Sequence, residues 1–223
     1  MYHNLLFDLD GTLTDSAEGI TKCVQYALQS AGIHEPDLQK LYPFIGPPLR
    51  ASFEKYYGFT SKQAEAATQK YRERYHKIGI YENKPYPQIL ELLQFLHAHK
   101  LTLAMATGKP EVYAVPIAQR FSFAPYLTAI TGSSLDGRLD NKALVVAEAL
   151  RRLNLITPRQ KEQTLLIGDR KEDVLAAHAN NIKCIGVGYG FGSYEELTDA
   201  GADYYAATVG DLKTLLQKIC LSI

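Results

Sequence analysis

The chain has 223 residues, 46% of them hydrophobic, and its 24 Lys and Arg side chains balance its 24 Asp and Glu side chains. This length can bury an α/β core and still carry a modest second domain, whereas the balanced charge predicts no nucleic-acid or membrane partner. Its three cysteines fit neither a disulfide framework nor a zinc site, so we expect a reducing, cytoplasmic location.

Two aspartates follow directly after the first apolar run, Leu5–Phe7, which predicts a short buried strand. Strand periodicity places Asp8 and Asp10 on the same side of the chain as it leaves the sheet. Two carboxylates this close need a positive partner, and a hard divalent cation such as Mg²⁺ would meet that need. Asp8 could then attack a phosphorus atom and Asp10 could carry a proton. A turn in which both acids accept hydrogen bonds from nearby N–H groups is the alternative that this pair alone leaves open.

From Ala17 to Asn83 the pattern is helical, and no strand pattern interrupts it. Gly32 is expected to end the first of these helices, and Ser61 to cap a later one that runs through Tyr75. We therefore expect an all-helical domain over residues 16–84, inserted into a core that comprises residues 1–15 and 85–223.

After the insert, helical and strand patterns alternate. Helices are expected at 87–98, 110–121, 141–153, 171–180 and 210–220, and strands at 101–107, 127–131, 164–168, 183–187 and 203–206. Such alternation predicts a doubly wound parallel sheet with helices on both faces. Ligands bind such sheets at the carboxyl ends of the strands. Asp8, Thr107 and Asp169 all lie at predicted carboxyl ends, which indicates a site at that edge.

A glycine-rich run follows the strand predicted at 183–187. It resembles a dinucleotide-binding loop, but no triplet of its glycines has the spacing G-x-G-x-x-G, and it follows a late strand instead of the first one. We therefore expect Gly186–Gly192 to form a flexible loop beside the site.

Four segments carry a resemblance that covers essentially the whole chain. They are Leu5–Asp15 with the pattern Asp-x-Asp-Gly-Thr, Leu101–Lys109 with a strand that ends in Thr, Asp140–Leu144 with a lysine that opens a helix, and Leu165–Asp173 with an acidic strand end. In this order they resemble the motifs of the haloacid dehalogenase-like superfamily of phosphohydrolases. The resemblance implies a Rossmann-like α/β core with a helical cap of the first type inserted after the first strand.

The resemblance also implies the catalytic roles. Asp8 would be the nucleophile that forms an aspartyl-phosphate, and Asp10 would protonate the leaving alkoxide and then activate water. Thr107 and the Gly108 N–H would donate hydrogen bonds to phosphoryl oxygens, since glycine allows close backbone approach. Lys142 would neutralise the nucleophile and the phosphate, although a solvated lysine at a helix start is the alternative for that residue.

The implied cofactor is Mg²⁺, because the ligand set consists only of oxygen atoms. Asp8, Asp10 and Asp169 are expected to be metal ligands. Asp173 is a further candidate, since it lies one helical turn after Asp169 and could act through water or by holding Lys142. A first-turn acid that complements the helix dipole is the other interpretation of Asp173.

The segments Ile45–Arg50 and Thr107–Glu111 resemble the phosphoglycolate phosphatase and 5′-nucleotidase-like branch of the superfamily. The expected activity is hydrolysis of a small phosphorylated metabolite, most like that of a bacterial 5′-nucleotidase, with phosphoglycolate phosphatase and phosphomutase as alternatives. A dehalogenase and a binding module with an inactive site are less compatible with the sequence than a phosphatase is. The reason is that the residues Asp8, Asp10, Lys142 and Asp169 are all intact. Arg50 and Lys109 are candidate substrate-binding residues. The alternative for Arg50 is that it is an exposed arginine at a helix start with no role in binding. We expect a monomer or a homodimer.

Overall fold

The computed structural model describes residues 1–136 and 138–221. The chain forms two compact units, one of Met1–Thr14 with Pro85–Ile223 and one of Asp15–Lys84. We refer to them as the core unit and the insert unit. The chain passes between them at β2 (Thr14–Asp15) and β3 (Lys84–Pro85), two short strands that pair with each other.

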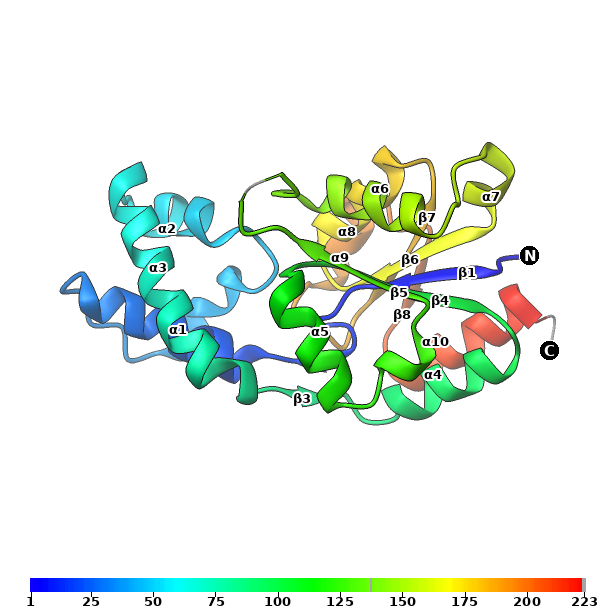
Figure 1. Cartoon of the computed structure of the whole chain (residues 1–223), viewed down its shortest axis with the longest axis horizontal. Coiled ribbons are helices and arrows are strands. Elements are labelled where there is room, and N and C mark those ends of the chain that lie inside the picture. The colour runs from blue at the N-terminus through cyan, green and yellow to red at the C-terminus, as the bar shows by residue number, and fades with distance from the viewer. Residues whose placement is uncertain (137, 222–223) are drawn as a thin grey trace. The chain divides into compact units, whose positions relative to one another are not determined.

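The core unit is built on a six-stranded parallel sheet (Figure 1). Its strands are β1 (Asn4–Phe7), β4 (Thr102–Pro110), β5 (Ala129–Ser133), β6 (Thr164–Gly168), β7 (Lys183–Val187) and β8 (Tyr204–Ala206). The order across the sheet is β5-β4-β1-β6-β7-β8, and each neighbouring pair is parallel. All four residues of β1 are buried, as expected of a central strand covered on both faces. The predicted fold class is confirmed.

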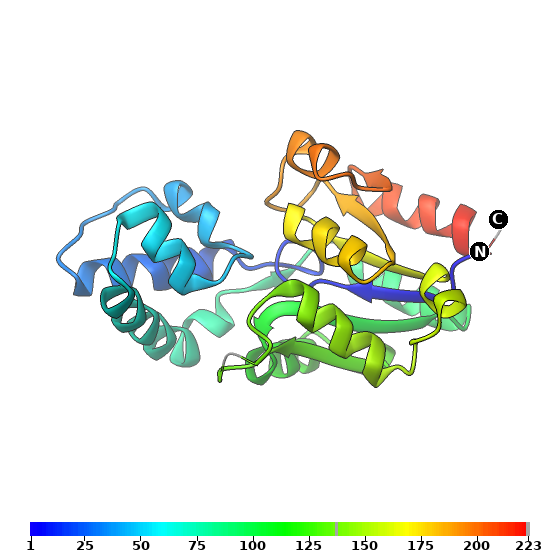
Figure 2. The ribbon, with the colours of Figure 1, turned by 90° about the horizontal axis from the view of Figure 1, so that it is seen from above.

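Helices cover both faces of this sheet (Figure 2). They are α4 (Ile89–Ala98), α5 (Glu111–Arg120), α6 (Lys142–Arg152), α7 (Pro158–Glu162), α8 (Lys171–Ala179), α9 (Tyr194–Asp199) and α10 (Val209–Leu216), with the shorter turns η3 (Ala124–Tyr126) and η4 (Gln217–Leu221). Right-handed crossovers place α4 and α5 on one face and α6 and α8 on the other, because the strand order reverses after β5. The short helices α7 and α9 were not predicted.

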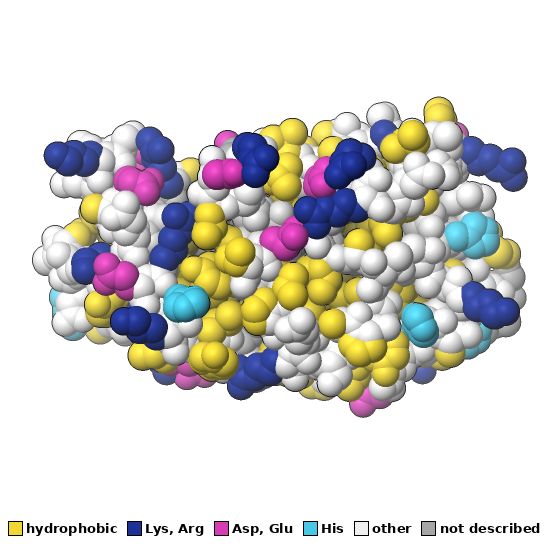
Figure 3. Space-filling view, in the orientation of Figure 1, with side chains coloured by type: hydrophobic (Ala, Val, Ile, Leu, Met, Phe, Trp, Pro, Cys, Tyr) yellow, Lys and Arg dark blue, Asp and Glu magenta, His cyan; other side chains and the backbone are white. Residues whose placement is uncertain are grey.

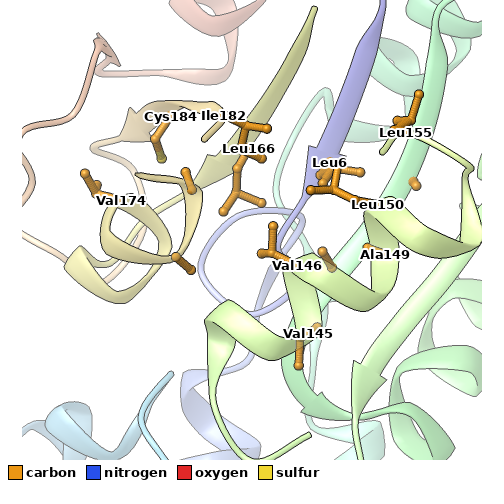
Figure 4. Packing of buried hydrophobic residues seen from close by; sticks show 14 of the residues in the cluster. Leu6, Val145, Val146, Ala149, Leu150, Leu155, Leu166, Val174, Ile182 and Cys184 are labelled. Carbon is orange, nitrogen blue, oxygen red and sulfur yellow. The ribbon is translucent and has the colours of Figure 1, made fainter. Parts of the chain in front are cut away.

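The face under α6 and α8 shows how the strands are fixed (Figure 4). Leu6 of β1 and Leu166 of β6 point into a cluster with Val146 of α6 and Val174 of α8, and all four side chains are fully buried. Burial of each such side chain contributes about 2 kcal/mol. These contacts anchor β1 and β6 in the apolar core. Asp8 and Asp169, both predicted site residues, follow directly after these two strands.

The insert unit contains α1 (Ala17–Ser30), η1 (Leu38–Phe44), α2 (Leu49–Tyr57), α3 (Ser61–Lys77) and η2 (Gly79–Tyr81). The helix α1 ends just before Gly32, whose φ of +80° suits a residue without a side chain. Glu82 accepts hydrogen bonds from Nη1 and Nη2 of Arg74 at 2.7 and 3.1 Å, which ties the end of the unit to α3.

The prediction that Ser61 caps α3 is wrong by one residue. The N-cap is Thr60, whose hydroxyl accepts from the Gln63 N–H while the Gln63 side chain accepts from the Thr60 N–H. This reciprocal capping box requires a spacing of three residues, which Thr60 and Gln63 have. Ser61 instead donates to Glu54 at 2.8 Å.

On the face shown in Figure 3, basic and acidic side chains are interspersed, with hydrophobic side chains gathered between them. In the described part of the chain, no helix combines the length and apolar character that a membrane span requires.

Candidate active site

Three aspartates converge at the carboxyl edge of the central strands. Asp8 follows β1, and its N–H donates to the Ile167 carbonyl of β6 at 2.9 Å. Asp169 follows β6, and Asp173 lies in the first turn of α8. Ligand atoms of Asp8, Asp169 and Asp173 all lie within 4.8 Å of one another. Their exposed fractions are 6%, 0% and 1%, so three carboxylates share a space almost closed to water.

Lys142 is the cation that faces this cluster. Its Nζ lies 2.8 Å from Oδ1 of Asp8 and 2.7 Å from Oδ1 of Asp173. Lys142 is the first residue of α6, and the Asn141 side chain caps that helix by accepting from the Leu144 N–H at 3.0 Å. Burial alone would lower the pKa of Lys142, but the carboxylates of Asp173 and Asp8 outweigh it and raise that pKa, so the ammonium stays charged.

The pKa values of the Asp169 and Asp173 carboxyl groups are both raised by their surroundings. Burial, followed by repulsion from Asp173 and Asp8, raises the pKa of Asp169 well above its usual range. Burial also raises the pKa of Asp173, because the nearby ammonium of Lys142 opposes this effect only in part. One lysine therefore does not balance the buried negative charge.

A divalent cation bound by Asp8, Asp169 and Asp173 would supply the missing positive charge. The ligand set is made of oxygen atoms, which is the chemistry that Mg²⁺ prefers. Three buried carboxylates that a single ion could contact at once fit a Mg²⁺ site. Asp10, also predicted as a ligand, is not in this group of three among the described residues.

Asp10 instead pairs with Lys109. The Lys109 Nζ donates to Asp10 Oδ2 at 2.6 Å, and both side chains are buried. Oδ1 of Asp10 is buried and has no hydrogen-bond partner among the described residues. Lys109 was predicted to bind substrate, and its pair with Asp10 was not predicted. The sequence held no local signal for this pair, since the two residues are 99 positions apart and the register of β4 shifts between Thr107 and Pro110.

Thr107 and Gly108 lie at the same edge of the sheet. Phe7 pairs with Met105, so Thr107 lies one residue beyond the level of Asp8. Thr107 is buried and its Oγ1 accepts from the Lys109 N–H at 3.2 Å, whereas Gly108 is exposed. Their assignment as phosphate donors stays a prediction.

Arg50 belongs to the insert unit, near the start of α2. Its side chain is exposed, and its Nε lies 3.5 Å from Oε1 of Glu54, one helical turn further on. A surface ion pair of this kind is weak, so it would not prevent the guanidinium from binding a ligand.

The glycine-rich run after β7 lies beside the site, as predicted, and hydrogen bonds connect it to residues there. The Phe191 N–H donates to Asp169 Oδ2 at 2.8 Å, and the Tyr189 hydroxyl donates to the Thr12 carbonyl at 3.1 Å. The contacts of Thr12, Tyr189 and Phe191 at the site were not predicted. The Phe191 donor is a backbone N–H, which residue type does not specify, and the Tyr189 hydroxyl reaches Thr12 across 177 positions of sequence.

A sequence model of the family described as haloacid dehalogenase-like hydrolase matches residues 5–187. This range contains each of the acidic and basic residues that converge at the site.

Among curated proteins, a 5′-nucleotidase of Pseudomonas aeruginosa is 46% identical over 97% of this chain and 96% of its own length. The tyrosine-protein kinase PtkA of Mycobacterium tuberculosis is 34% identical over 95% of this chain and 72% of its own length. A phosphoglycolate phosphatase of Agrobacterium fabrum is 27% identical over 83% of this chain and 80% of its own length.

Among solved structures, a predicted phosphatase from Clostridium acetobutylicum superposes with a TM-score of 0.94. It is 45% identical, and the match covers 98% of this chain and 100% of that one.

Proposed function

This chain belongs to the haloacid dehalogenase-like hydrolases and is a phosphatase of that family, and we propose that it is a Mg²⁺-dependent 5′-nucleotidase that acts through an aspartyl-phosphate on Asp8. The observation that carries this proposal is the arrangement of Asp8, Asp169 and Asp173 around Lys142. Because three carboxylates and one ammonium lie together there, it supports the assignment of Asp8 as nucleophile, Lys142 as the neutralising cation and the aspartates as metal ligands.

The first half-reaction would use both oxygens of Asp8. Oδ1 accepts from the Leu9 N–H at 2.7 Å and faces Lys142 at 2.8 Å, so we assign the attack on phosphorus to Oδ2. A bond forms between Oδ2 and phosphorus while the bond from phosphorus to the ester oxygen breaks. Asp10 gives its proton to the departing alkoxide. Bound Mg²⁺ would neutralise charge on the phosphoryl oxygens and on the carboxylates that hold it.

In the second half-reaction Asp10 would take a proton from water, which then attacks the phosphorus and releases Asp8 and inorganic phosphate. Lys109 would hold Asp10 through Oδ2, which leaves the unpaired Oδ1 for the proton transfer. Thr107 and the Gly108 N–H would donate to the phosphoryl oxygens, and such positioning provides most of the catalysis in phosphoryl transfer.

Substrate choice is the finer part of the proposal. The similarity to a 5′-nucleotidase supports nucleoside monophosphates, and the similarity to a phosphoglycolate phosphatase supports phosphoglycolate as the alternative. A phosphomutase of the same fold is a further alternative, in which the phosphoryl group on Asp8 passes to a second hydroxyl of the substrate and not to water.

A panel of phosphomonoesters tests the function directly. Phosphate release from nucleoside monophosphates, phosphoglycolate and sugar phosphates is measured with Mg²⁺ and with EDTA. The proposal expects Mg²⁺-dependent release, fastest from nucleoside monophosphates. Isomerised sugar phosphates without release would indicate a mutase. Transfer from ATP to a protein tyrosine without release from any ester would indicate the activity for which PtkA is named.

The acid/base role of Asp10 can be separated from general phosphate binding. Asp10→Asn should slow hydrolysis of a nucleoside monophosphate by about 10²- to 10⁴-fold, because both steps require a proton transfer. In single-turnover experiments, Asp10→Asn should slow the first step less for p-nitrophenyl phosphate than for a nucleoside monophosphate, because the p-nitrophenolate leaving group barely needs a proton. Equal first-step losses for good and poor leaving groups would contradict this assignment.

Arg50 is proposed to bind a polar or anionic group of the substrate other than the transferred phosphate. Arg50→Ala should then change the ranking of kcat/KM among nucleotides, phosphoglycolate and sugar phosphates, and it should have little effect on acetyl phosphate. Lys62→Ala, which removes another exposed cation of the insert unit, is the control. A uniform loss on every substrate, acetyl phosphate included, would exclude a role in specificity.

We also propose a cytoplasmic location. The cysteines Cys23, Cys184 and Cys220 are all free and buried, which is compatible with a reducing compartment.

A further inference from the structure

Both oxygens of the Asp169 carboxylate are held by hydrogen-bond donors from elsewhere in the chain. The Thr12 hydroxyl donates to Oδ1 at 3.3 Å, and the Phe191 N–H donates to Oδ2 at 2.8 Å. These donors lie 157 and 22 positions away in the sequence. The orientation of this buried side chain therefore depends on two loops, one after β1 and one after β7.

The second of these loops, Gly188–Gly192, is called the glycine loop here. Its close approach to Asp169 requires glycine for reasons of space. A Cβ on Gly190 would overlap the Asp169 side chain and the Gly11 carbonyl, and a Cβ on Gly192 would overlap the Asp169 carbonyl. The loop therefore packs directly against both the backbone and the side chain of Asp169.

Tyr189 connects the glycine loop to the segment that follows β1. Its hydroxyl donates to the Thr12 carbonyl at 3.1 Å, and its ring packs edge-on against Tyr86, with 5.0 Å between ring centroids. Thr12 thus receives a hydrogen bond through its carbonyl and gives one to Asp169 through its hydroxyl. The two donors to Asp169 are linked to each other through Tyr189.

We propose that the glycine loop, through Tyr189 and the Phe191 N–H, is a positioning element that holds Asp169 in the orientation required for metal binding. This inference rests on the proposed function, which makes Asp169 a metal ligand. Asp8 and Asp173 lie beside Asp169 and repel its charge, so an unrestrained carboxylate would turn away from them. Fixed donors oppose that movement, and hydrogen bonds to a ligating carboxylate commonly tune metal affinity in this way.

Tyr189→Phe is the direct test, because it removes one hydroxyl and keeps the ring against Tyr86. Binding of Mn²⁺ to the free enzyme is followed by electron paramagnetic resonance, with Mg²⁺ as competitor. We expect an affinity about tenfold lower in Tyr189→Phe. The matched control is Tyr204→Phe, which removes a hydroxyl hydrogen bond of the same length, 3.1 Å to Tyr2, at the far strand β8. Its Mn²⁺ affinity should equal that of the wild type.

Gly190→Ala provides a second test, because the added methyl group would overlap the Asp169 side chain without removing a hydrogen-bond donor. It should weaken Mn²⁺ binding at least as much as Tyr189→Phe, whereas Gly210→Ala should not, since a Cβ there meets only the Thr208 Oγ1 at 3.6 Å. Thermal unfolding in EDTA measures any effect on folding alone.

Lower unfolding temperature in EDTA with unchanged Mn²⁺ affinity would show a purely structural role and overturn the inference. Wild-type affinity in Tyr189→Phe would do the same. If the wild type itself bound no Mn²⁺, the metal site of the proposed function would be wrong and this inference would fall with it.

Discussion

Asp8→Asn is expected to abolish phosphate release from every phosphomonoester while leaving the fold intact. The amide is nearly isosteric with the carboxylate and can still accept from the Leu9 N–H through its oxygen. It cannot form the acyl phosphate, because a neutral amide is a poor nucleophile. Loss of a nucleophile typically lowers kcat by about 10⁴-fold or more.

Labelled phosphate provides the measurement for this prediction. Acid quenching of the wild type during turnover should retain label on the protein, and Asp8→Asn should retain none. Circular dichroism and thermal unfolding establish that the variant is folded. Asp199→Asn, the same change at an exposed aspartate at the end of α9, should keep full activity. Turnover near the wild-type rate in folded Asp8→Asn would exclude the aspartyl-phosphate mechanism.

The strands next to the site illustrate what the sequence can predict. The expected ranges 164–168 and 183–187 coincide with β6 and β7, because short apolar runs bounded by polar residues are typical of buried parallel strands. β4 extends further than expected, to Pro110, and its register with β5 shifts between Thr107 and Pro110. Such an irregularity depends on the neighbouring strand and has no local signal.

Helix α9 shows a signal that was present but not used. Ser193 caps it by accepting from the Glu196 N–H at 3.1 Å, a pattern that predicts a helix start. The predicted loop ended at Gly192, and no element was predicted between it and the strand expected at 203–206.

Within the site, the sequence predicts which residues lie close together when each of them directly follows a strand. Asp8 and Asp169 follow adjacent parallel strands, so the topology alone brings them together. The pair of Asp10 and Lys109 and the donors to Asp169 depend on how loops fold over the sheet edge. Those contacts join residues 99, 157 and 22 positions apart, and residue type does not specify them.

Lys142→Met is expected to have two large effects, because it removes a buried cation that faces Asp8 and Asp173 at 2.8 and 2.7 Å. Breaking a buried ion pair by removing one partner costs about 3–5 kcal/mol, which corresponds to a fall in Tm of about 10 °C for a chain of this size. Turnover should fall by about 10³-fold or more, since the charge that developed on the phosphoryl group would lose a nearby cation.

Metal dependence distinguishes this electrostatic account from a simple packing defect. Without Lys142, the buried carboxylates of Asp8 and Asp173 lose the ammonium that lies 2.8 and 2.7 Å from them, so bound metal would compensate a larger share of their charge. Mg²⁺ should therefore raise the Tm of Lys142→Met by more than it raises that of the wild type, although it should not restore turnover. Lys218→Met, at an exposed lysine, should change neither value. An equal Mg²⁺ shift in Lys142→Met and wild type would mean that Lys142 does not compensate the charge of these carboxylates.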